Sequence, residues 1–219
     1  MTRALRFTTG EYYHIYNRGT EKRKIFESRG DYSRFSVLLY ACNTLKPTNL
    51  REQGNRITDV IERERGETIV SVGAYCLMPN HFHLLVKEKV ENGISRFMQK
   101  IQTAYTMYFN EKNQRTGALM QGKFKAVQAI DDRYLKYLIS YIHLNPIKLI
   151  DSTWKETGIR NKVKAKNFLL DRYQYSSFID YIGKQRPEAS ILEPKVLTDL
   201  VDHKEEITEN LFDWFNYCP

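Results

Sequence analysis

The chain has 219 residues, 42% of them hydrophobic, which is enough to bury a core as one domain with or without extensions. Its net charge of +8 is uneven: residues 188–219 hold eight acidic and two basic residues, so residues 1–187 carry +14. Three cysteines (Cys42, Cys76, Cys218) form neither a metal-binding spacing nor a disulfide framework. No stretch resembles a secretory signal or a membrane span of about 20 apolar residues, so we expect a cytoplasmic protein without membrane contact.

Seven elements are predicted in the order strand, helix, strand, strand, helix, strand, helix. The strands show alternating or continuous apolar residues, and the helices show apolar residues at helical spacing. Asp31 is the expected N-cap of the first helix, the pair Pro79-Asn80 turns a hairpin, and Pro146 stops the last helix. The predicted ranges are 11–19, 28–45, 67–78, 81–88, 92–113, 117–130 and 131–145.

This order predicts an α+β fold of the ferredoxin-like or RRM-like kind, an antiparallel sheet with helices on one face and the other face free to meet a ligand. We expect three regions: a folded domain over residues 1–150, a basic extension over 151–187, and an acidic helical tail over 188–219.

The strongest local signal is "MPNHFHLLV", which places His81 and His83 two residues apart in a predicted strand. Alternate residues of a strand share a face, so the two imidazoles should lie side by side while Phe82 points into the core. Two imidazoles in that geometry can hold one divalent cation. An isolated pair of this kind is more often two surface histidines, so the pair needs support from elsewhere in the chain.

That support comes from "YIHLNP", in which Tyr141 and Asn145 share a helix face at a spacing of four residues. The amide oxygen of Asn145 suits Mg²⁺ or Mn²⁺, and the phenol of Tyr141 would lie one turn away. A core aromatic followed by a C-capping asparagine would give the same pattern.

The motifs "YCLMPNHFHLLV" and "YIHLNPIK" together resemble the REP-associated branch of the IS200/IS605-type single-tyrosine transposases, which are HUH endonucleases. Supporting stretches include "YHIYNRG" and "AYTMYFNEKNQRTGALMQGKFKA", and the resemblance extends from about Thr8 to Gly183. It implies that residues 1–150 form the catalytic domain, which cleaves and rejoins single-stranded DNA near hairpins through a 5′-phosphotyrosine. Carried over by position, Tyr141 is the nucleophile and His81, His83 and Asn145 hold Mg²⁺ or Mn²⁺.

The resemblance leaves three points open. His143 has no counterpart role and should face away from Tyr141. Tyr105 and Tyr108 are competing nucleophiles, although Tyr105 sits at core spacing. The wider family dimerises and exchanges the tyrosine helix, whereas the REP-associated branch can act as monomers, so monomer and homodimer both remain possible.

Two basic stretches are candidates for holding DNA. Lys123 and Lys125 flank Phe124 as strand residues of one face would, and a later stretch alternates basic residues that an extended chain would align along a phosphate backbone. The later residues are Arg160, Lys162, Lys164 and Lys166.

Three other functions fit parts of this pattern. A non-catalytic RNA- or single-stranded-DNA-binding module shares the fold and charge but needs neither the histidine pair nor Tyr141. A metal-dependent hydrolase would require more ligands than the sequence offers, and its usual (β/α)₈ barrel takes about 250 residues. A relaxase or replication initiator shares the chemistry, but the short chain and single tyrosine argue against it.

Overall fold

The computed structural model describes residues 6–47, 56–63 and 65–193. Its centre is a four-stranded antiparallel sheet with the strand order β2-β3-β1-β4. This order and the chain sequence β-α-β-β-α-β define the ferredoxin-like arrangement, so the predicted fold class is confirmed. The strands are β1 (Tyr12–Arg18), β2 (Val70–Met78), β3 (His81–Glu88) and β4 (Lys125–Gln128).

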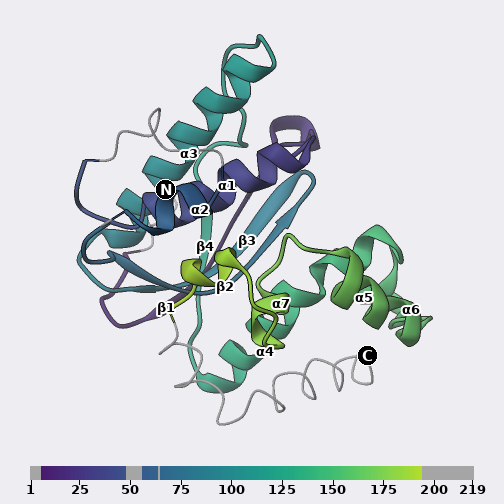
Figure 1. Cartoon of the computed structure of the whole chain (residues 1–219). Coiled ribbons are helices and arrows are strands. Elements are labelled where there is room, and N and C mark those ends of the chain that lie inside the picture. The colour runs from purple at the N-terminus through teal and green to yellow at the C-terminus, as the bar shows by residue number, and fades with distance from the viewer. Residues whose placement is uncertain (1–5, 48–55, 64, 194–219) are drawn as a thin grey trace, which may run out of the picture.

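Helices α1 (Arg29–Ala41) and α3 (Gly93–Lys112) lie on one side of the sheet (Figure 1). Between them and the sheet lies an apolar core, in which the ring of Phe82 lies 5.1 Å from that of Phe35 in α1. Phe82 is fully buried, as predicted from its place between the two histidines. The strand alternation therefore turns the histidines toward the opposite face.

The N-cap of helix α1 differs from the one that we expected. Ser28 is its N-cap, and Asp31 stands three residues later as the second member of a capping box. The Asp31 carboxylate accepts hydrogen bonds from the backbone nitrogens of Glu27 and Ser28, both at 2.8 Å. The prediction of Asp31 as the N-cap was therefore wrong by three residues, because the side chain caps from inside the helix.

Helix α4 (Asp132–Leu144) crosses the second face of the sheet, where it contacts β2 and β3 (Figure 1). It starts at its N-cap Asp131, whose carboxylate accepts from the backbone nitrogen of Tyr134. It ends where η2 (Asn145–Leu149), a 3₁₀ segment containing Pro146, takes over. The face that we expected to be free is thus partly covered, and α4 covers it with its tyrosines.

The extension after η2 packs as a set of short helices around a small apolar cluster of its own that includes Trp154 and Phe178. Its chain then returns to the edge of β2, where the backbone nitrogen of Leu77 donates to Tyr175 and that of Ser177 donates to Tyr75. The elements are α5 (Trp154–Thr157), α6 (Lys162–Asn167), η3 (Phe168–Arg172), α7 (Phe178–Tyr181) and η4 (Pro187–Ile191).

The extended conformation predicted for Arg160 to Lys166 was wrong. Asn161 caps α6, since its side chain accepts from the backbone nitrogen of Lys164, and the basic residues that follow lie on a helix. Alternate residues of a helix do not share a face, so these four charges do not form one straight row.

The remaining short segments are η1 (Thr20–Lys22), which follows β1, and α2 (Thr58–Ile61), which precedes β2. Of the predicted acidic tail, residues 188–193 belong to η4 and its flank, and the rest lies outside the described residues. None of the helices in the described ranges is long and apolar enough to cross a membrane.

Candidate active site

The histidine pair lies on the sheet face that α4 crosses. His83 is paired in register with Tyr16 and His81 with Arg18, so the side chains of β1 and β3 form one row on this face. The imidazole centroids of His81 and His83 are 5.0 Å apart with their planes perpendicular. The two histidines therefore lie on a common face of the sheet, as predicted.

A third histidine, His14 in β1, completes the row. Its Nε2 lies 2.8 Å from Nδ1 of His83, and the two rings stack with centroids 5.0 Å apart. His14 is only 6% exposed, so this hydrogen bond is made away from water. Sequence reasoning missed His14, although its spacing of two residues from Tyr16 in "YHIY" placed both on one strand face.

The hydrogen bonds leave the outer nitrogens of the pair available. Nδ1 of His81 donates to the amide oxygen of Asn80 at 2.6 Å, since that oxygen can only accept, so Nε2 of His81 carries the lone pair. Nδ1 of His83 forms a hydrogen bond with Nε2 of His14, and Nε2 of His83 carries the lone pair in the tautomer in which Nδ1 donates. Partners on the inner nitrogens fix ring orientation and tautomer in metal-binding histidines.

All three imidazoles are neutral at physiological pH. Burial, and then the charge of Lys155, lowers the pKa of His14 to about 4. The same two causes come first for His81, whose pKa is also lowered to about 4. Burial, the neighbouring histidines and Lys155 bring the pKa of His83 well below its usual value. Neutral imidazoles are the form that binds a cation.

Tyr141 projects from α4 onto this row. Its ring centroid lies 5.6 Å from that of His83 and 5.8 Å from that of His14, each in an edge-on arrangement. The phenol is half-buried, and Nζ of Lys155 donates to its oxygen at 3.0 Å. The tyrosine and histidine that are 58 residues apart in the sequence therefore meet at one site.

Asn145 lies one turn beyond Tyr141 and is 2% exposed. Its amide nitrogen donates to the backbone oxygen of Tyr141 at 2.7 Å. This contact holds the amide nitrogen against the backbone of α4. The described residues contain no group of three or more His, Cys, Asp or Glu side chains able to hold a metal, and the metal site expected at His81, His83 and Asn145 stays a prediction.

The competing tyrosines lie elsewhere. Tyr105 is fully buried and its hydroxyl donates to the backbone oxygen of Ile25 at 2.5 Å, which makes it part of the core. Tyr108 donates to Asp31 at 3.0 Å. Both belong to α3, on the opposite side of the sheet from α4 (Figure 1).

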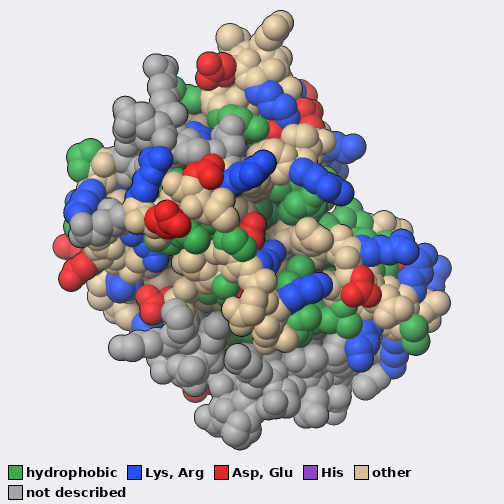
Figure 2. Space-filling model, viewed as in Figure 1, with side chains coloured by type: hydrophobic (Ala, Val, Ile, Leu, Met, Phe, Trp, Pro, Cys, Tyr) green, Lys and Arg blue, Asp and Glu red, His purple; other side chains and the backbone are tan. Residues whose placement is uncertain are grey.

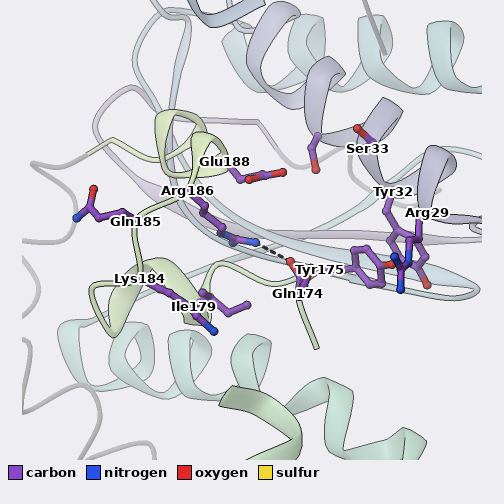
Figure 3. Close-up of a pocket in the computed structure, with 11 residues that line it drawn as sticks. Arg29, Tyr32, Ser33, Gln174, Tyr175, Ile179, Lys184, Gln185, Arg186 and Glu188 are labelled. Carbon is purple, nitrogen blue, oxygen red and sulfur yellow. Dashed lines mark hydrogen bonds between the residues drawn. The ribbon is translucent and has the colours of Figure 1, made fainter. Parts of the chain in front are cut away.

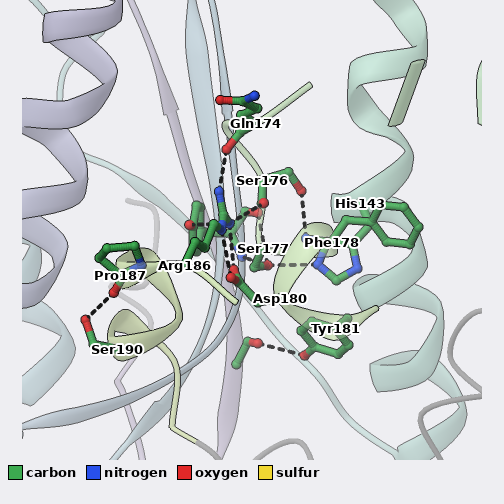
Figure 4. Close-up of polar contacts among 12 residues, drawn as sticks. His143, Gln174, Ser176, Ser177, Phe178, Asp180, Tyr181, Arg186, Pro187 and Ser190 are labelled. Atoms are coloured by element: carbon green, nitrogen blue, oxygen red, sulfur yellow. Dashed lines mark hydrogen bonds and ion pairs between the residues drawn. The ribbon is translucent and has the colours of Figure 1, made fainter. Parts of the chain in front are cut away.

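His143 faces away from Tyr141, as expected from its position two residues later. It is fully buried, and its Nε2 lies 2.8 Å from Oγ of Ser177, a contact visible in Figure 4. Ser177 in turn accepts from the backbone nitrogen of Tyr75. His143 therefore ties α4 to the segment that pairs with β2, and it plays no part in the histidine row.

The predicted DNA-binding lysines are exposed. Lys125 pairs in register with Tyr16, so it lies on the same sheet face as His83, and Lys123 precedes the strand. Figure 2 shows Lys and Arg side chains gathered over the region of α5 and α6. The exposed basic residues there include Arg160, Lys162, Lys164 and Lys166.

A separate pocket of about 300 Å³ lies between α1 and residues 174–188 and shares no lining residue with the histidine row (Figure 3). Arg186 lies in its wall, where its guanidinium binds the Asp180 carboxylate and three backbone or tyrosine oxygens (Figure 4). Arg186 therefore has a structural role, since these contacts hold residues 174–180 and Tyr75 of β2 together.

The fold and site together define a ferredoxin-like domain that carries paired histidines on a sheet face and a tyrosine on the helix that crosses it. The family model described as "Transposase IS200 like" matches residues 8–145, and the chain belongs to this family, as its motifs predicted. No curated protein matches the chain. Among solved structures, a REP-associated tyrosine transposase bound to a REP hairpin has the same fold, with a TM-score of 0.52 and 12% identity over 86% of this chain and 90% of that one.

Proposed function

We propose that this transposase cleaves and rejoins single-stranded DNA near hairpins through a 5′-phosphotyrosine at Tyr141, assisted by Mg²⁺ or Mn²⁺ at His81, His83 and Asn145. The observation that carries the proposal is the contact between Tyr141 on α4 and the histidine row. A half-buried phenol and two neutral imidazoles therefore meet at one point of this sheet face.

The side chains present fit a divalent cation. His81 and His83 are neutral and have their inner nitrogens occupied, and the amide oxygen of Asn145 is a ligand that Mg²⁺ and Mn²⁺ accept. When bound, such a cation would polarise a non-bridging oxygen of the scissile phosphate.

The protein's own residues would direct the attack. The phenol oxygen of Tyr141 forms a bond to phosphorus, the bond from phosphorus to the 3′-oxygen breaks, and that oxygen takes a proton to become a free 3′-hydroxyl. The phenol proton leaves to solvent. The phosphodiester energy is kept in the tyrosine ester, so a 3′-hydroxyl can reverse the step and join new ends.

Hairpin DNA is the proposed partner. The support is the family, the hairpin bound in the solved structure of the same fold, and the charge of +14 over residues 1–187. Unpaired bases beside a hairpin could stack on the partly exposed ring of Tyr16 on the sheet face. One chain supplies the tyrosine and the histidines, so a monomer would hold the whole set; a homodimer that exchanges α4 would hold it too.

The test is a denaturing gel of labelled hairpin DNA incubated with protein and Mn²⁺. The wild type should yield DNA that migrates with protein, whereas Tyr141→Phe, which removes one oxygen and keeps the ring, should yield none and still bind the hairpin. His81→Ala should also be inactive, and Tyr105→Phe is the matched control that should react normally. Hairpin binding without any adduct from the wild type would instead favour the non-catalytic binding module.

A further inference from the structure

Lys155 reaches the reacting end of Tyr141 from a separate helix. It belongs to α5, fourteen residues after the tyrosine, and its Nζ donates to the phenol oxygen at 3.0 Å. The same Nζ lies 4.1 Å from the centroid of the Tyr141 ring and 5.6 Å from that of Trp154. It is half-buried, so its charge is only partly screened by water.

In the part of the chain that the structure describes, positive side chains lie beside the histidine row. Nζ of Lys155 binds the phenol of Tyr141, whose ring lies edge-on to His83 and His14. Arg18 is paired in register with His81. The proposed metal ligands, in contrast, are neutral side chains. A divalent cation at this site is therefore repelled by nearby ammonium and guanidinium groups, and an anionic phosphate would be attracted by all of them.

We propose that Lys155 is a further catalytic residue of the transesterification described above. In the protein without DNA it holds the Tyr141 oxygen in place and disfavours cation binding by its charge. With DNA bound, the same ammonium lies beside the phosphate, where it stabilises the negative charge that grows on the phosphate oxygens during attack. The divalent cation and the scissile phosphate then bind cooperatively, because the phosphate offsets the repulsion between the cation and Lys155.

Lys155 is not a proton carrier in this scheme. It remains an ammonium while the bond from Tyr141 to phosphorus forms and the bond to the 3′-oxygen breaks. Its contribution is one positive charge and one hydrogen bond at the attacking oxygen. The proposal rests on the proposed function, since it assigns a role within that reaction.

A purely structural role makes a different prediction. Lys155 also packs on Tyr141 and Trp154, so it could serve only to hold α5 against α4. Lys155→Met keeps most of the apolar stem and removes the charge, and Lys155→Arg keeps both charge and donors. Lys89→Met is the control, because it also removes one positive charge. Lys89 follows the last residue of β3, whereas His81 is the first, and its Nζ donates to the hydroxyl of Thr68.

The experiment measures three quantities for each protein: Mn²⁺ affinity without DNA, affinity for a hairpin-forming single strand from the flanks of the gene, and the rate of adduct formation at saturating DNA. Lys155→Met should form the adduct at least tenfold more slowly, with DNA affinity within about threefold of wild type, yet bind Mn²⁺ several-fold more tightly. Lys155→Arg should recover most of the rate and the weaker Mn²⁺ binding.

A Lys155→Met protein that reacts at the wild-type rate overturns the role of Lys155. So does a slow Lys155→Met protein whose Mn²⁺ affinity is unchanged or weakened, or a Lys155→Arg protein as slow as Lys155→Met, because each is what loss of packing would produce. A wild type that binds hairpins but forms no adduct contradicts the proposed function itself, which separates the two failures.

Discussion

Some residues of the site could be predicted from the sequence, and others could not. The spacing of His81 and His83 in a strand was sufficient to place both on one face, and the spacing of Tyr141 and Asn145 placed them one turn apart. His14 was not predicted as part of the site because it meets His83 across 69 residues of chain, through the register of two strands that no local pattern defines. Contacts of this kind depend on strand pairing and are visible only in the folded chain.

His14 is predicted to orient His83 for metal binding. His14→Phe keeps a buried ring of similar size but removes the hydrogen bond to Nδ1 of His83, so the imidazole loses its fixed orientation. Loss of such a partner typically weakens metal affinity by about 10- to 100-fold. Mn²⁺ titration of the DNA-free protein followed by electron paramagnetic resonance measures this directly.

Tyr16→Phe is the control for that titration. The ring of Tyr16 stacks on that of His14 with centroids 5.0 Å apart, and its hydroxyl makes no hydrogen bond to His14 or His83 among the described residues. It should bind Mn²⁺ as the wild type does. An unchanged Mn²⁺ affinity in a folded His14→Phe protein would mean that His14 is only a packing residue.

At the scale of elements, α4 does two things at once. Tyr141 on one side of the helix meets the histidine row, and His143 on another side is tied to Ser177. Its limits were predicted to within one residue at each end, because Asp131 and Pro146 are strong start and stop signals. Helix α6 was missed because Lys162, Lys164 and Lys166 alternate with other residues but are themselves exposed. A strand is indicated by alternation of apolar, buried residues with polar ones, and an alternation of exposed lysines does not indicate one.

His143 should make the attachment of α4 sensitive to acid. Complete burial lowers its pKa to about 3, below the ordinary value of 6.5, so protons bind more readily to the unfolded chain. Its contribution to stability is complete above about pH 6.5 and is lost as the pH falls toward 3. Between pH 7.5 and 5.0 this single group should cost about 2 kcal/mol.

Urea unfolding of the wild type and His143→Gln at the two pH values isolates this group, since every other titrating residue is common to both proteins. The drop in unfolding free energy should be about 2 kcal/mol smaller in His143→Gln. If both proteins lose the same free energy, His143 does not titrate on unfolding in this range and its assigned burial is wrong.

For the whole molecule, the order of elements predicted the fold because each strand and helix carries its own apolar periodicity, and few topologies suit β-α-β-β-α-β. The sequence could not predict that α4 would lie across the second sheet face or that residues 175–177 would return to the edge of β2. Both depend on long-range packing. The uneven charge remains the main whole-molecule argument for a nucleic-acid partner.

That charge predicts strongly salt-dependent DNA binding. If Lys123 and Lys125 each contact a phosphate, changing both to Ala should reduce the slope of log affinity against log salt by about 1.5. Fluorescence anisotropy of a labelled hairpin over a range of KCl concentrations provides the slope. A slope equal to that of the wild type would mean that the DNA backbone runs over another part of the basic surface.

Mass spectrometry of the isolated adduct detects whether Tyr141 becomes covalently joined to DNA. After nuclease and trypsin digestion, a nucleotide joined through its 5′-phosphate should be found on the peptide of residues 137–148, with fragmentation placing it on Tyr141 and leaving Tyr137 unmodified. The competing tyrosines fall on the separate peptide of residues 101–112. A nucleotide on that second peptide, or on Tyr137, would show that Tyr141 is not the nucleophile.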